Sequence, residues 1–126
     1  MSHPNSIIKG YTATAAVAAS RIVKYGAADN TVVPGAAATD LLVGVSVQTV
    51  DADIGEVCDV VKSGPAIVRL GGAVTRGALL TCDASGKAVT AAPAAGANVR
   101  VIGVADASGV LDDLIPCTVS LGSLQG

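Results

Sequence analysis

The chain has 126 residues, a length typical of one domain, and a formal net charge of −2 with only 14% charged residues. It contains two Tyr and no Phe or Trp, so it lacks the basic stripe and the aromatic platform with which proteins bind nucleic acid. Fifteen glycines and five prolines interrupt an apolar content of 51% at short intervals. This composition predicts an all-β fold, a small β-barrel or β-sandwich of short antiparallel strands.

The first 20 residues form an N-terminal arm that is rich in Ser, Thr and Ala and has no strong periodic pattern. No secretory signal is visible in it, and residues 11–20 are too few and too polar to cross a membrane. Such an arm cannot fold against itself, so it is either a frayed terminus or an arm laid across a partner. In the second case Ile7, Ile8 and Tyr11 would be buried against that partner. Residues 21–126 are expected to form a single β domain.

Two strands are expected in residues 21–48, separated by a turn-rich connection at residues 26–34. The first strand covers residues 21–25. In residues 41–48 the two-residue period of a half-buried strand leaves Ser46 and Gln48 exposed. The inward positions would be Leu41, Val43, Val45 and Val47. Gly44 falls on the outward face, where a bulge or a closely approaching neighbour would exclude a side chain.

Residues 51–55 have the D-x-D-x-G spacing with which a calcium loop begins. The closing position of such a loop falls on Lys62 instead of an acidic residue. We therefore expect a solvated loop, followed by a strand at residues 56–63.

Short strands and glycine-centred turns alternate in residues 64–105. Residues 78–82 and 87–91 flank the sequence Asp83-Ala84-Ser85-Gly86. This is typical of a hairpin in which Asp opens a type I turn and Gly adopts the left-handed conformation. A strand at 99–104 repeats the pattern of residues 41–45, so both strands are expected to meet a similar packing requirement around a glycine.

The final strand is expected at residues 115–121. Its alternation places four side chains inward: Ile115, Cys117, Val119 and Leu121. Pro116 has no N–H, which predicts an edge strand or a bulge.

No catalytic constellation is visible. The single histidine, His3, lies in the arm, and adjacent Asp112 and Asp113 would point to opposite faces of a strand or into solvent. The three cysteines, Cys58, Cys82 and Cys117, are widely spaced, which favours small buried side chains over a disulfide or zinc site. We expect a protein that is not an enzyme and has no cofactor or metal.

A family resemblance rests on the order of these glycine and valine patterns. The resemblance lies in the segments GPAIVRLGGAVTRGALLT at 64–81, DASGKAV at 83–89 and VIGVA at 101–105. Over residues 21–122 the chain resembles the small tailed-phage capsid decoration (cement) proteins, a family formerly described as a domain of unknown function.

The resemblance implies a structural virion protein on the exterior of an icosahedral capsid, made in the host cytoplasm. There it would cement neighbouring subunits of the major capsid protein. It would also associate with itself, with a homotrimer favoured and a dimer possible. Neither nucleic acid nor a membrane is an expected partner. A surface poor in charge is in keeping with burial against other subunits.

The alternative is a capsid-displayed binding module for a receptor or glycan. Glycan sites commonly use aromatic platforms, and Tyr11 and Tyr25 are the only aromatic residues that could supply one.

Overall fold

The computed structural model describes residues 6–47 and 51–126, and in these ranges the chain forms β-strands joined by turns and loops. This confirms the all-β fold. The strands are β1 (Ile7–Ala13), β2 (Ile22–Tyr25), β3 (Thr31–Pro34), β4 (Leu42–Ser46), β5 (Val57–Arg69), β6 (Leu79–Cys82), β7 (Ala88–Thr90), β8 (Asn98–Ala105) and β9 (Leu114–Gln125).

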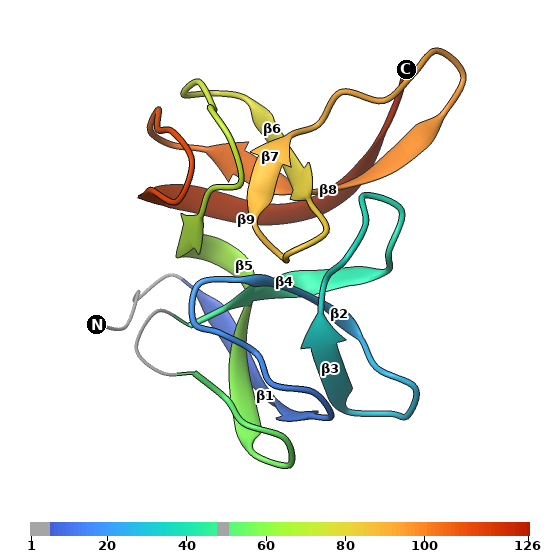
Figure 1. Ribbon diagram of the computed structural model, residues 1–126, viewed down its shortest axis with the longest axis vertical. Helices are drawn as coiled ribbons and strands as arrows, with labels where there is room; N and C mark the ends of the chain where they lie inside the picture. Colours follow the sequence, from blue (N-terminus) through green and yellow to red (C-terminus); the bar gives the residue numbers. More distant parts are fainter. Residues whose placement is uncertain (1–5, 48–50) are drawn as a thin grey trace.

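Five strands close into a barrel, which is the lower half of Figure 1. They are hydrogen-bonded in the order β1-β3-β2-β4-β5, and β5 pairs with β1 to complete the ring. The pairings are antiparallel apart from β1 with β3. Small and β-branched side chains suit this narrow interior. Its buried residues are Tyr11, Ala13, Val17, Val23, Val32, Val43, Ala52, Cys58 and Val60.

The remaining strands extend the sheet in the order β5-β9-β8-β6-β7, the upper half of Figure 1. A parallel bridge between Leu70 and Ala88 brings β7 back to the end of β5. The amide of Gly71 also donates to the carbonyl of Ala88 at 2.8 Å. This second lobe therefore curls almost into a second ring.

β5 belongs to both lobes. Its first half pairs with β1 and β4, and its second half, from Gly64 to Arg69, pairs with β9. Gly64 has a φ of 96° at this change of partner, a conformation that residues with a Cβ rarely adopt. The glycine lets one strand turn from the barrel into the second lobe.

Besides the cluster inside the barrel, a second hydrophobic cluster is shared by the two lobes. Ile22, Val45 and Val61 of the barrel strands pack in the same cluster as Leu70, Leu80 and Ile102. Two backbone hydrogen bonds also cross the seam, from Ile22 N to Gly86 O at 2.7 Å and from Arg69 N to Ser20 O at 2.9 Å. The described chain is therefore one folded unit.

The structure confirms the expected hairpin and the role of two glycines. β6 and β7 pair around residues 83–86, with Gly86 at a φ of 73°. A Cβ on Gly44 would overlap the carbonyl oxygen of Val61, and one on Gly103 would overlap that of Thr118. Both glycines also lie at register shifts in their sheets. In both strands the repeated pattern therefore marks a position where a side chain would collide with the backbone of the neighbouring strand.

Both alternatives expected for residues 1–20, a frayed terminus and an arm laid across a partner, are wrong for the described part, which pairs with other strands of its own chain. β1 lies between β3 and β5 in the barrel, and Tyr11, Ala13 and Val17 are buried there. Residues 26–34 also differ from expectation, because β3 forms at their end with Val32 in the core. Both errors concern strands whose partners are distant in sequence or complete the ring.

The predicted faces of residues 41–48 are partly wrong. β4 is buried throughout because the barrel core covers one face and the second lobe covers the other. Ser46 is buried with its hydroxyl satisfied, donating to Ala18 O and accepting from Arg21 N. Leu41 precedes the strand and is 57% exposed, and Gln48 lies outside the described residues.

The last strand also differs from its prediction. Ile115, Cys117 and Val119 are buried, but Leu121 is 45% exposed because β9 pairs only with β8 after Val119. Pro116 lies in an interior strand, between β5 and β8. Its carbonyl accepts from Asp106 N at 3.0 Å, so its nitrogen faces the same side, just past the end of β8. The reciprocal bond to Asp106 is therefore missing, and the regular pairing of β8 with β9 ends at Ala105 and Cys117.

Candidate functional site

The three residues proposed for partner binding fall into two groups. Ile7 and Ile8, at the start of β1, are 63% and 41% exposed. Tyr11 is only 4% exposed and belongs to the barrel core. Ile7 and Ile8 remain available to a partner, whereas Tyr11 is covered by its own chain.

The acidic residues singled out in the sequence have structural partners. Asp112 lies 2.6 Å from Lys87 Nζ, and this interaction holds the pKa of its carboxyl below the usual range. Asp113 accepts from the amide of Val110 and Asp51 from that of Ala19. In the described ranges no group of three or more His, Cys, Asp or Glu residues is arranged to hold a metal. His3 lies outside those ranges.

The three cysteines are buried and free, as their apolar settings predict. Burial raises the pKa of Cys58 to about 11 and those of Cys82 and Cys117 to about 12. Thiols held neutral in this way are poor nucleophiles at pH 7.

One mouth of the barrel forms a cleft of about 520 Å³ between the start of β1 and the turn that joins β2 to β3. The alternation of side chains along the strands explains why these residues face the cleft. Lys9 and Tyr11 lie opposite Val60 and Cys58, which face the barrel core, so both point to the inner face. Tyr25 pairs in the same way with the buried Val32.

The cleft gathers both tyrosines of the chain and two of its lysines. The rings of Tyr11 and Tyr25 meet edge to face with their centroids 6.5 Å apart. The Nζ atoms of Lys9 and Lys62 lie 4.9 and 5.7 Å from the centroid of the Tyr11 ring, within the range of cation–π interactions.

Our sequence interpretation did not single out Lys9. It named Tyr25 only as an aromatic residue for the glycan alternative and Lys62 only as the residue that rules out a calcium loop. A signal for Lys9 exists, because it stands two residues from Tyr11 and therefore on the same face of a strand. The signal for Tyr25 and Lys62 is weaker, since their proximity depends on ring closure between strands far apart in sequence.

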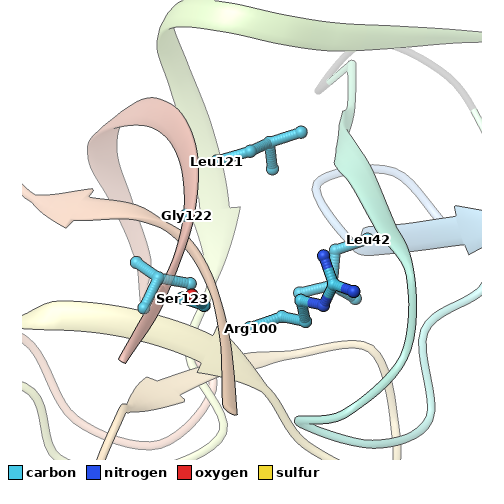
Figure 2. Close-up of a pocket in the computed structure, with 6 residues that line it drawn as sticks. Leu42, Arg100, Leu121, Gly122 and Ser123 are labelled. Atoms are coloured by element: carbon cyan, nitrogen blue, oxygen red, sulfur yellow. The ribbon is translucent and has the colours of Figure 1, made fainter. Parts of the chain in front are cut away.

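A second cleft, of about 270 Å³, lies at the seam between the lobes. Figure 2 shows its lining, with Leu42 and Arg100 on one side and Leu121 opposite. Arg100 is exposed, and its backbone amide donates to the carbonyl of Ala38 at 2.7 Å. The cleft combines one cationic side chain with two leucines and has no acid–base pair.

Neither cleft supplies a catalytic constellation, and comparison with known proteins supplies the missing context. A family model described as phage cement protein matches residues 2–112. The chain belongs to the phage cement protein family. It is therefore a structural phage protein associated with the virion capsid.

The fold has a counterpart among solved structures. The chain is similar to the N base of head fiber gp8.5 in bacteriophage phi29, with 22% sequence identity and a TM-score of 0.65. The similarity covers 90% of this chain and 93% of the other. At this identity the likeness shows a common fold. Among curated proteins no match is found.

In the described residues, no helix has the length and apolar character needed to cross a membrane.

Proposed function

We propose that this cement-family protein binds the outer surface of an icosahedral capsid and joins neighbouring subunits of the major capsid protein. The observation that carries the proposal is the family match over residues 2–112. A cement protein needs surface that becomes buried on assembly, and it needs no catalytic pocket.

The exposed apolar side chains support this role. Ile7 and Ile8 of β1 are exposed, and Val57 of the neighbouring strand β5 is 67% exposed. A second exposed group at the turn before β9 consists of Val110, Leu111 and Leu114. Burial of such side chains would stabilise a complex by about 25 cal/mol per Å² of apolar surface. We propose Ile7 and Ile8 as capsid contacts.

Sedimentation with phage heads tests the proposal. The purified chain is mixed with expanded or unexpanded heads of the phage that encodes it, and bound protein is measured in the pellet. We expect binding to expanded heads and an increase in the force or temperature that the heads withstand. Absence from both pellets would refute capsid binding, and binding with no gain in head stability would refute cementing.

We also propose that the chain associates with itself, with a homotrimer favoured and a dimer possible. The low charge content and the exposed leucine, isoleucine and valine residues support self-association. Sedimentation equilibrium of the purified protein measures the mass directly. A single species at the mass of the 12.2 kDa chain would contradict it.

The alternative, a displayed module for a receptor or glycan, is the weaker candidate. Tyr11 and Tyr25 do meet in one cleft, but the Tyr11 ring is buried and has a lysine over it. Tyr25, at 47% exposure, is left as the single open aromatic surface. Glycan-array binding that needs Tyr25 would favour this alternative over cementing.

A further inference from the structure

The cleft at the mouth of the barrel is lined by two lysines and two tyrosines, which general apolar capsid contacts do not explain. We propose that the cleft between Lys9 and Lys62 binds a carboxylate side chain, Asp or Glu, of the capsid surface to which the protein attaches. This proposal rests on the proposed function and adds to it the site of contact and the chemistry of the partner.

Two ammonium groups line this cleft. Lys9 and Lys62 both lie over the ring of Tyr11. Lys9 Nζ donates to the side-chain oxygen of Asn30 at 3.2 Å, a neutral acceptor. Among the described residues, the two ion pairs are Lys24–Asp40 and Lys87–Asp112. Neither involves Lys9 or Lys62.

Neighbouring residues favour the positive charge of the cleft. Contact with the Tyr11 side chain raises the pKa of Lys62, so its ammonium form is favoured. Asp29 lines the rim of the cleft without reaching ion-pair distance of either lysine. Two positive charges against one carboxylate leave the cleft cationic within a chain whose net charge is −2. Both ammonium groups would attract an entering carboxylate.

The aromatic residues favour a protein carboxylate over an acidic sugar. A sugar ring stacks on open aromatic faces, and this cleft offers only that of Tyr25, because Tyr11 is 4% exposed with Lys9 over its ring. A carboxylate needs only donors. Two ammonium groups of the lining supply them, and Tyr25, which is 47% exposed, provides apolar contact for the side chain that carries the carboxylate.

Charge removal tests the contact on intact heads. The double variant Lys9→Gln/Lys62→Gln is compared with Arg76→Gln/Arg100→Gln, which removes two exposed cations elsewhere. Wild-type binding should weaken as salt rises, because salt screens the contact. We expect the lysine variant to bind about tenfold more weakly, with a flatter salt dependence. The arginine variant should bind like wild type. Far-UV circular dichroism and urea unfolding check that all variants are folded.

The two tyrosines give a second readout that does not need heads. The chain has no other Tyr and no Trp, so its intrinsic fluorescence comes from this cleft. A capped tetra-glutamate peptide at concentrations on the order of millimolar should change that fluorescence. A capped tetra-glutamine peptide should leave it unchanged, as should tetra-glutamate added to the lysine variant.

The outcomes separate the two proposals. If wild type binds heads and the lysine variant binds equally well, the carboxylate contact is refuted and capsid binding stands. If wild type binds no heads, both proposals fail. A fluorescence response to a glucuronate oligosaccharide, with none to tetra-glutamate, would identify a saccharide site and overturn this assignment.

Discussion

Two glycines show how closely the strands approach each other. Gly44 lies against the carbonyl of Val61 and Gly103 against that of Thr118. Atoms of the main chain cannot move aside as a flexible side chain can, so a methyl group at either position would push two strands apart.

We predict that Gly44→Ala lowers the free energy of unfolding by about 2 kcal/mol or more, the cost of an overpacked core. Gly122→Ala in β9 is the matched control, because a Cβ there meets no atom within 4 Å. Urea unfolding measures both. Equal stability of the two variants would contradict the close approach at Gly44.

The buried thiols link stability to alkaline pH. In the folded chain the pKa values of Cys58, Cys82 and Cys117 are raised from 9.0 to about 11, 12 and 12. Unfolded thiols ionise near pH 9, so high pH favours the unfolded chain. The stabilisation is complete below pH 9 and is lost as pH rises toward 11 to 12.

We therefore predict that Cys117→Ala reduces the loss of stability between about pH 8 and 10 by on the order of 1 kcal/mol. The free energy of unfolding at each pH gives this difference. Val119→Ala truncates a neighbouring buried residue that does not titrate, and it should keep the pH dependence of wild type. An identical pH dependence for Cys117→Ala and wild type would show that this thiol does not contribute.

At the scale of elements, β1 closes the barrel. It pairs with β5 over six positions from Ile7 to Thr12 and with β3 at Thr12 and Ala13. Its removal would expose the edges of two strands and the core around Cys58 and Val60.

Deletion of residues 1–20 is therefore expected to abolish cooperative folding. This replaces the expectation that residues 21–126 form the β domain without the first 20 residues. Circular dichroism and urea unfolding of the truncated chain test it. A truncated chain with a sharp unfolding transition would show that β1 is dispensable for the fold.

To test whether β1 contacts the capsid, the variant must keep the fold intact. Ile7→Ser/Ile8→Ser alters two exposed side chains and should change stability by less than about 1 kcal/mol. If these residues contact the capsid, the variant should bind heads several-fold more weakly. Leu41→Ser/Ile54→Ser changes two exposed residues to which no capsid contact is assigned, and serves as the control. Equal head binding by wild type and the β1 variant would exclude Ile7 and Ile8 as contacts.

At the scale of the whole molecule, β5 and the shared core join the two lobes. Gly64 marks the point where β5 passes from one lobe to the other, and Figure 1 shows this single strand connecting the lower and upper halves. Because one of the two core clusters holds residues of both lobes, unfolding of either lobe would expose apolar side chains of the other.

We predict one cooperative unfolding transition. Tyrosine fluorescence reports only on the barrel, since both tyrosines lie in β1 and β2, while far-UV circular dichroism reports on all strands. The two urea curves should coincide. A separate fluorescence transition would show that the barrel unfolds independently of the second lobe.

Local signals in the sequence determined much of this protein. Alternation placed the strands near residues 22, 42 and 114, and apolar runs placed those near 57, 79 and 98. The Asp83–Gly86 turn specified its hairpin, and the two glycines marked close backbone approach. These features depend on residues a few positions apart. The family resemblance rests on the order of the same patterns.

Only the tertiary structure decided which strands close the barrel. The pairing of β1 with β5 joins residues about 50 positions apart, and β3 becomes a strand because it completes that ring. The same closure buries Tyr11, leaves Ile7 and Ile8 exposed, and brings Lys9, Lys62 and Tyr25 to one mouth. A strand's own residues indicate which side chains share a face, but the strand's partners determine whether that face is core, cleft or open surface.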